Sequence, residues 1–331
     1  MKAKNTWLMG MAVIIFIATI FVPHISYSGK YPERDITVLV PWPAGGGCDM
    51  VTRALFKNAH KYFPVNVQIV NVVGGGGLVG LAQTASAKPD GYTLCMFEIN
   101  SFQGYYVQGM TKYNLIKDFT LLNRVAFADT VLAVKKDSQF KSLKEFIEYA
   151  KANPEKLNVA VGIGKGGCWH MPIALLLNSE KAKVKYVYMQ GGAPARTAAL
   201  GGHVDACAIG IMEASNFVKS GDLRLLGLFS EKRNPHHPDV PTVAELGYPK
   251  IAMGVSFVLG GPKGLAKEIV QTILDYSKKC FNDPEFRELL DKQVISIPDK
   301  FYGPEETKKY LEENEARVTK VLTDLGMAKK E

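Results

Sequence analysis

Short apolar runs recur along this chain and alternate with segments that have the 3.6-residue period of amphipathic helices. This alternation is typical of an α/β fold in which helices separate strands of largely parallel sheets. The runs that we expect to be strands cover residues 36–40, 67–70, 93–97, 131–134, 157–161, 184–188, 206–209 and 223–229.

The helices between these runs have recognisable starts. Ser142 with Glu145, and Thr242 with Glu245, have the spacing of a capping box and predict that helices begin there. Long amphipathic patterns over residues 265–280 and 305–325 predict that the chain ends in helices.

The N-terminus has the pattern of a secretory signal peptide. Lys2 and Lys4 precede an apolar run, and Ser26 and Ser28 provide small residues at cleavage-site spacing before Gly29. The run is shorter than the roughly 20 residues that span a bilayer. We therefore expect residues 1–28 to be removed and the mature protein to be exported, with an uncleaved anchor as the alternative.

Length and charge limit the remaining possibilities. The 303 residues that follow residue 28 exceed what one core usually organises, so two domains are expected. The formal charge of the whole chain is +8, and it falls to +6 without the two lysines of the N-terminal segment. Basic and acidic residues are mixed, and no basic run contains interleaved aromatic residues, so a nucleic-acid partner is not expected.

A glycine loop joins the first strand to the next helix. The segment from Trp42 through Pro43, Ala44, Gly45, Gly46, Gly47 and Cys48 leads into a helix that we expect from Asp49. Glycines at a helix N-terminus let backbone N–H groups approach an anion closely. An ordinary strand-to-helix turn is the alternative for this segment.

A second glycine loop follows the strand at residues 157–161 and precedes an apolar helix. Its Gly162, Gly164 and Gly167 have the G-x-G-x-x-G spacing of a dinucleotide-binding fold. Such a fold also needs an acid at the end of the next strand, where this chain has Gln190. A nicotinamide enzyme is therefore disfavoured.

Six motifs, in order along the mature chain, resemble the solute-binding receptors of tripartite tricarboxylate transporters. Each motif is weak alone, but their order and spacing together are characteristic. They are Tyr31-Pro32; Val40 to Gly47 with Asp49; Pro89 to Leu94; Gly164 to His170; Gly191 to Gly202 with Val204 and Asp205; and Gly221 to Arg224 with Pro238 to Glu245.

The resemblance implies a type II periplasmic binding protein fold, with two α/β lobes around a central cleft. Chain crossings near residues 125–134 and 251–259 then place residues 29–128 and 252–331 in lobe 1 and residues 129–251 in lobe 2. The family holds a ligand carboxylate between two loops, which correspond here to Pro43–Asp49 and to Gly164, Lys165, Gly166, Gly167 and Cys168. Asp49 itself is better explained as a residue of the first helical turn than as a ligand contact.

Other candidate site residues depart from the family pattern or lie beside the cleft. Trp42 and Trp169 make the loops less polar, and Gln190 stands where the family often has lysine. Glu98, followed by Asn100, comes just after a strand near the cleft. If Glu98 faces the ligand, it can recognise an amino group; if it faces solvent, it has no role in binding.

The five cysteines form no C-x-x-C pair and no zinc-like spacing, and one at least stays unpaired within the chain. Cys48 and Cys168 each end a glycine loop. Three interpretations remain open for them: small residues lining the cleft, a disulfide between the lobes, or a thiol or soft-metal site near His170.

These observations predict a periplasmic binding protein without catalysis or cofactor. It would be a monomer that captures a small organic carboxylate and delivers it to the membrane permease subunits. The alternative is a periplasmic component that binds a similar carboxylate and signals to a membrane sensor kinase.

Overall fold

The structure is a computed structural model that describes residues 31–329. From Tyr31 onward the chain forms one compact unit. The predicted signal peptide lies outside the described residues. Within this range no helix combines the length and the apolar character needed to cross a bilayer.

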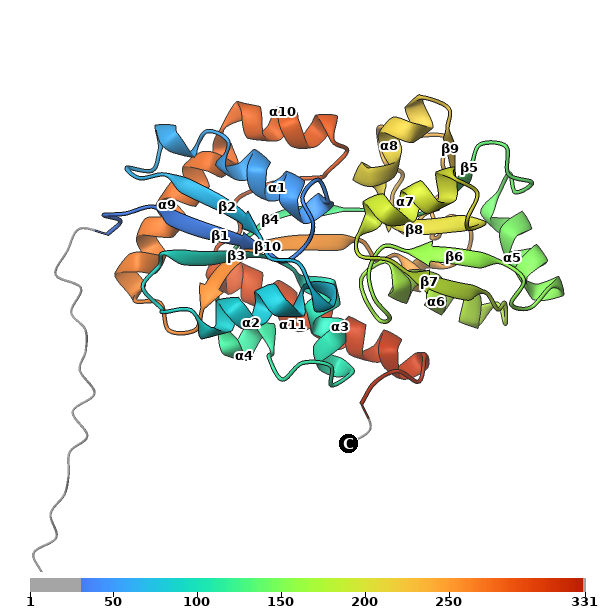
Figure 1. Cartoon of the computed structure of the whole chain (residues 1–331), viewed down its shortest axis with the longest axis horizontal. Helices are drawn as coiled ribbons and strands as arrows, with labels where there is room; N and C mark the ends of the chain where they lie inside the picture. Colours follow the sequence, from blue (N-terminus) through green and yellow to red (C-terminus); the bar gives the residue numbers. More distant parts are fainter. Residues whose placement is uncertain (1–30, 330–331) are drawn as a thin grey trace, which may run out of the picture. The chain divides into compact units, whose positions relative to one another are not determined.

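The first sheet has five strands in the order β2-β1-β3-β10-β4 (Figure 1). Strands β1 and β2 and strands β1 and β3 pair in parallel, whereas β10 is antiparallel to both of its neighbours. The strands are β1 (Ile36–Val40), β2 (Val67–Asn71), β3 (Thr93–Glu98), β4 (Phe119–Ala128) and β10 (Val255–Pro262).

The second sheet repeats this arrangement in the order β7-β6-β8-β5-β9. Here β5 is the strand that runs antiparallel to its two neighbours, β8 and β9. The strands are β5 (Thr130–Lys135), β6 (Asn158–Val161), β7 (Lys185–Tyr188), β8 (Ala206–Gly210) and β9 (Leu223–Leu228).

The chain passes from one sheet to the other at two places. Asp129 alone separates β4 from β5, and the return runs from the end of β9 through the short helix η3 (Pro249–Ile251) to β10. All eight runs expected to be strands coincide with strands of these sheets. The lobe boundaries after residues 128 and 251 remain a prediction, because the residues from Tyr31 onward form a single compact unit.

Helices join the strands and cover the sheets. Those connected with the first sheet are α1 (Gly47–Phe56), η1 (Ala59–Lys61), η2 (Gly75–Gly77), α2 (Leu78–Ser86), α3 (Ile99–Val107), α4 (Leu115–Asp118), α9 (Lys267–Asn282), α10 (Pro284–Lys292) and α11 (Pro304–Asp324). Those connected with the second sheet are α5 (Leu143–Ala152), α6 (His170–Ser179), α7 (Gly192–Leu200) and α8 (Ile211–Lys219).

The expected helix starts have different outcomes. The Ser142 hydroxyl accepts a hydrogen bond from the Glu145 N–H at 3.2 Å and caps α5, as predicted. Thr242 and Glu245 also exchange their two hydrogen bonds, but only turns follow them. The prediction of a helix there was wrong, because Gly247 adopts a positive φ of 96° and Pro249 follows within one helical turn.

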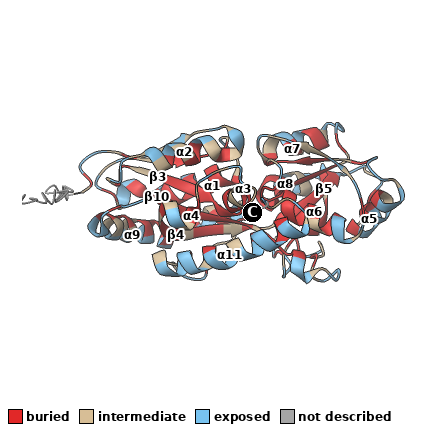
Figure 2. Cartoon of the chain, turned by 90° about the horizontal axis from the view of Figure 1, so that it is seen from below, coloured by how far each residue is buried: buried red, intermediate tan, exposed pale blue. Residues whose placement is uncertain are grey.

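Apolar side chains from both sheets form the core (Figure 2). The inner strands are buried and the edge strands β2 and β7 are partly exposed, whereas α9 and α11 bury one face and expose the other, as the amphipathic patterns predicted. The strand ends therefore lie on a rigid frame, and the loops that follow them are held in place.

Candidate functional site

The first glycine loop leaves β1 and turns sharply into α1. Gly45 has a positive φ of 78°, a conformation that favours glycine, and the Gly46 N–H donates to the Pro43 carbonyl at 3.3 Å. Gly46 is the N-cap of α1 and uses no side chain to cap it. The N-terminus of α1 is thus built from backbone alone.

Asp49 holds this loop from inside the first turn of α1. Its side chain is buried and accepts hydrogen bonds from the Gly45 N–H at 2.9 Å, from Arg53 Nε and from Asn71 Nδ2. Burial alone would raise the pKa of Asp49, but these hydrogen bonds outweigh it and lower the pKa. Asp49 therefore acts through the loop it fixes.

A partly open cavity of about 40 Å³ lies at the N-terminus of α1. It brings together nine of the residues expected at the site, and neither Gly45 nor Asp49 is among them. The lining residues are Trp42, Pro43, Ala44, Gly46, Gly47, Cys48, Glu98, Ile163, Trp169, Gln190, Gly191, Gly192, Ala193, Pro194, Glu213, Val255 and Phe257.

The second predicted loop is not brought into this cavity beyond its flanking Ile163 and Trp169. The Cys168 N–H donates to the Ser101 hydroxyl at 3.0 Å, and the Gly166 N–H donates to His170 Nδ1 at 3.1 Å. The Gly167 N–H donates to the Gly164 carbonyl. These N–H groups already have partners within the protein.

Residues of the second loop instead pack against α3, where Gln108 donates to the Lys165 carbonyl. The start of the loop, Gly162 to Gly164, lines a neighbouring cavity of about 70 Å³, which shares Trp42 and Gln190 with the first one. The glycine stretch that does meet the first loop is Gly191–Gly192, at the N-terminus of α7.

Glu98 lines the cavity, but its carboxylate caps α3. Its two oxygens accept hydrogen bonds from the backbone N–H groups of Asn100 and Ser101, both at 3.0 Å. Burial raises the pKa of Glu98, and these hydrogen bonds partly oppose the rise. Both oxygens thus have partners already, which leaves little capacity for the amino-group recognition considered for this residue.

Glu213 is the charged residue among the cavity residues that the sequence did not predict. It lies in the first turn of α8, and one carboxylate oxygen accepts a hydrogen bond from the Gly210 N–H at 3.3 Å. The other oxygen, Oε1, has no hydrogen-bond partner among the described residues, although the residue is only 2% exposed. Burial raises the pKa of Glu213 to about 7.

A signal for Glu213 was present in the sequence. An acid three residues after the glycine that ends an apolar strand lies in the first turn of the next helix. The strands β6 and β8 are parallel neighbours, so the segments after them emerge at the same edge of the sheet.

Two tryptophan side chains add N–H groups to the polar groups that line the cavity. Trp42 packs against Phe102, with ring centroids 4.9 Å apart, and Trp169 follows the second loop. The Nε1–H groups of both tryptophans are buried without a hydrogen-bond partner in residues 31–329. Buried indole N–H groups normally find a partner, so two without one at a single cavity suggest a ligand site.

The cysteines are free and buried, so Cys48 and Cys168 form no disulfide. Burial raises the pKa of both thiols well above its ordinary value, which disfavours a reactive thiolate. Across residues 31–329, no group of three or more histidine, cysteine or acidic side chains is arranged to hold a metal ion. Of the three interpretations, a small residue lining the cavity fits Cys48.

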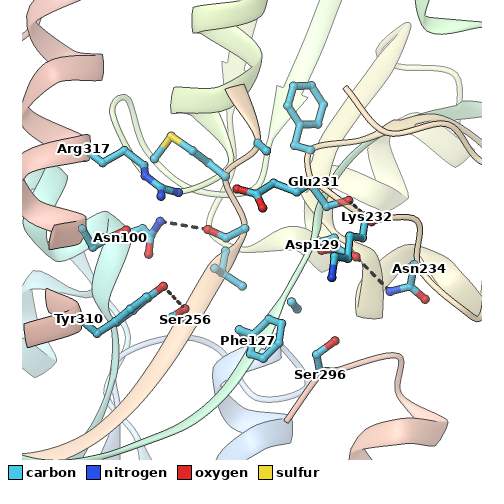
Figure 3. Close-up of a pocket in the computed structure, with 18 of the residues that line it drawn as sticks. Asn100, Phe127, Asp129, Glu231, Lys232, Asn234, Ser256, Ser296, Tyr310 and Arg317 are labelled. Carbon is cyan, nitrogen blue, oxygen red and sulfur yellow. Dashed lines mark hydrogen bonds between the residues drawn. The ribbon is translucent and has the colours of Figure 1, made fainter. Parts of the chain in front are cut away.

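A larger cavity, of about 410 Å³, lies beside the crossing strands (Figure 3). Asn100 belongs to this cavity and donates to the Gly254 carbonyl at 3.0 Å. Asp129 accepts a hydrogen bond from Asn234, and Ser256 pairs with Tyr310. Among the residues predicted for the site, this cavity is lined by Asn100 and by no residue of either glycine loop, so the smaller cavity is the one that matches the prediction.

Two five-stranded sheets, each with its own helices, have the architecture of a two-lobed periplasmic binding protein. The chain belongs to the receptor family of tripartite tricarboxylate transporters, whose model matches residues 51–327. The expected family and α/β binding-protein fold are thereby confirmed.

Individual relatives agree with this assignment. The chain is 32% identical over 310 residues to the UPF0065 protein in the gbd 5′ region of Cupriavidus necator, a match that covers 93% of this chain and 92% of that protein. Periplasmic binding protein BugD has a TM-score of 0.85 at 26% identity, over 91% of this chain and 100% of that chain. MatC from Rhodopseudomonas palustris with bound malate has a TM-score of 0.82 at 28% identity, over 88% and 100% of the two chains. BugD is a periplasmic binding protein, and the matching family is one of receptors.

Proposed function

We propose that this protein is a periplasmic receptor that captures a small organic carboxylate and delivers it to a tripartite tricarboxylate-type membrane permease. The ligand carboxylate binds at the cavity between the first glycine loop, Pro43–Gly47, and the glycine stretch Gly191–Gly192. This pair replaces the expected pair that included Gly164–Cys168, where the N–H groups of Gly166, Gly167 and Cys168 already have partners.

One observation carries the proposal: helices α1 and α7 both begin at this cavity. Helix N-termini carry unpaired N–H groups and a partial positive charge, and both favour an anion. The unpartnered indole N–H groups of Trp42 and Trp169 add two neutral donors. The described lining contains no lysine, arginine or histidine, so binding of a carboxylate here depends on dipoles and N–H groups.

Capture requires the two sheets with their helices to move apart and close again. A cavity of about 40 Å³ has room for only a few water molecules. A dicarboxylate therefore enters only when the loops separate. The segments at Asp129 and before β10, where the chain passes between the sheets, are suited to act as hinges.

The relatives support the ligand class. MatC, at 28% identity, was solved with malate, which is a small dicarboxylate. The family assignment supports delivery to a membrane permease, because its members are the receptors of tripartite transporters.

The test is a titration that follows tryptophan emission. The full chain is exported, purified without its signal peptide, freed of bound ligand by unfolding and refolding, and titrated with mono-, di- and tricarboxylates. Only Trp42 and Trp169 then remain, and both line the cavity. A saturable change with one class of acid supports the proposal. No change with any acid, for a protein shown to be folded by circular dichroism, refutes it.

A further inference from the structure

We infer that Glu213 makes the site selective for a carboxylate that also carries a positively charged amino group, as an amino acid does. This inference rests on the proposed function and specifies its ligand class. It follows from the position of one buried carboxylate and from the groups around it.

The Glu213 carboxylate lies where the glycine segments of the site meet. A Cβ atom built on Gly192 would overlap it, so that position at the start of α7 tolerates only glycine while Glu213 is in place. A Cβ atom on Gly46, at the start of α1, would lie 3.8 Å from Oε1. The side chain thus reaches from α8 to the N-termini of α1 and α7, inside the cavity proposed for the ligand.

Glu213 Oε1 is a buried acceptor without a hydrogen-bond partner in the described chain. The other carboxylate oxygen, Oε2, accepts the hydrogen bond of the capping box of α8, so helix capping does not provide a partner for Oε1. Buried polar atoms normally have a partner, because an unpaired one loses its hydrogen bonds to water without replacement. A donor on the ligand would supply that partner.

The surrounding groups favour a cationic donor. Burial raises the pKa of Glu213 by more than the N–H groups of Gly210 and Gly47 and the charge of Arg196 lower it. The Arg196 guanidinium stacks on Phe217 at 4.3 Å and donates to the Glu213 backbone carbonyl, so it makes no direct hydrogen bond to the carboxylate. Glu98 places a second acid in the same cavity. A ligand with only negative groups would add charge beside two acids, whereas an ammonium group would compensate one of them.

The unpartnered atoms of the cavity match such a ligand. Trp42 and Trp169 have N–H donors for a carboxylate, and Glu213 has an acceptor for an ammonium group. A zwitterion offers both complements, and a plain dicarboxylate offers only one.

The affinity for a ligand with an ammonium group and the affinity for a plain dicarboxylate should change in opposite directions with pH. The charged and titratable groups around Glu213 are Arg196, Glu98 and the buried thiols of Cys168 and Cys207, whose pKa values burial raises. Glu213, with a pKa of about 7, changes its charge near neutral pH. An ammonium ligand prefers ionised Glu213, so its affinity rises as pH increases through 7. A plain dicarboxylate prefers the protonated form, so its affinity falls.

The experiment uses matched acids that differ by one amino group. Calorimetry measures binding of succinate against aspartate and glutarate against glutamate, between pH 6 and 8.5, to the wild type, to Glu213→Gln and to Glu288→Gln. Glu288 is an exposed acid on α10 and controls for the change in charge. The wild type and Glu288→Gln should bind the amino acid of a pair at least tenfold more tightly, and Glu213→Gln should lose that preference and its pH dependence.

The outcomes separate the inference from the proposed function. Tighter wild-type binding of the plain acids, with affinity falling as pH rises, overturns the inference and leaves a carboxylate receptor. An unchanged preference in a folded Glu213→Gln variant also overturns it. If that variant does not fold, the wild type alone tests the inference: its affinity should rise with pH for the amino acids and fall with pH for the plain acids. The absence of binding for all four acids refutes the proposed function together with the inference.

Discussion

Replacing Asp49 with alanine tests whether the first glycine loop is fixed from inside α1. The change removes the acceptor of three groups: the Gly45 N–H, Asn71 Nδ2 and Arg53 Nε. It leaves these donors without their buried partner and frees the loop that begins the cavity.

The structure sets the size of the effect. The Arg53 side chain is half-exposed, so its ion pair with Asp49 contributes at most about 0.5 kcal/mol. The hydrogen bond from Asn71 to a buried, charged acceptor contributes about 2 kcal/mol. Water can replace Asp49 at the exposed Gly45 N–H. We therefore expect Asp49→Ala to lower the free energy of unfolding by about 2–3 kcal/mol in total.

The assay is thermal and urea unfolding at neutral pH. An unfolding entropy of about 2.1 cal/mol/K per residue, over roughly 300 residues, converts this loss into a decrease in Tm of about 4 °C. The pKa of Asp49 is lowered in the folded state. Its contribution is therefore fully present above the unfolded value of about 3.9 and is lost as pH falls through the folded value.

The control is Asp137→Ala, which removes an exposed ion pair with Lys135 and should change stability by less than about 0.5 kcal/mol. Asp49→Ala should also weaken carboxylate binding at least tenfold, whereas the control should not. If both variants have the same Tm and the same affinity, Asp49 does not hold the loop and the reasoning is refuted.

Three further predictions concern the cavity and its surroundings. Gly46→Asp should abolish carboxylate binding, because it adds a negative side chain near Glu213. Gly46→Ser adds an uncharged side chain of similar size and should still bind the carboxylate, although more weakly than the wild type. Equal affinities of the two variants in calorimetry would contradict an anion site. His170 is buried with a pKa of about 4, against about 6.5 when unfolded, so the unfolded state takes up the proton first as pH falls. Urea unfolding should therefore show that the free energy of unfolding of the wild type falls by about 2 kcal/mol between pH 7.5 and 5 because of His170, and that His170→Gln lacks this decrease. The same dependence of stability on pH in both proteins would contradict this role of His170. Trp42→Phe and Trp169→Phe should each remove part of the ligand-induced emission change and weaken binding severalfold in a fluorescence titration; full affinity in both would exclude the indole N–H groups as donors.

Local patterns in the sequence specified much of the fold. The apolar runs became strands, and Ser142 capped the helix that its spacing predicted. Such features depend on neighbours within a few residues, so the sequence displays them directly. The family motifs gave the family correctly, because they report the order of loops along the chain.

The site depended on contacts between segments that lie far apart in the sequence. The N–H groups of the Gly164–Cys168 loop looked free, but the structure pairs the Cys168 N–H with Ser101, 67 positions away. Glu98 looked available, but α3 uses both of its oxygens. Which buried group has a partner is a property of packing, and no spacing along the chain reveals it.

The sequence by itself determined that this chain is an α/β protein whose first glycine loop begins a helix with a backbone-built N-terminus. Only the tertiary structure decided what that terminus faces. It brought Gly191–Gly192 and Glu213 from the second sheet to the same cavity as Trp42 and left Glu213 Oε1 without a partner. The physical reason is that local propensities fix each strand, loop and helix, whereas the close approach of two sheets determines which charges and hydrogen-bond donors meet.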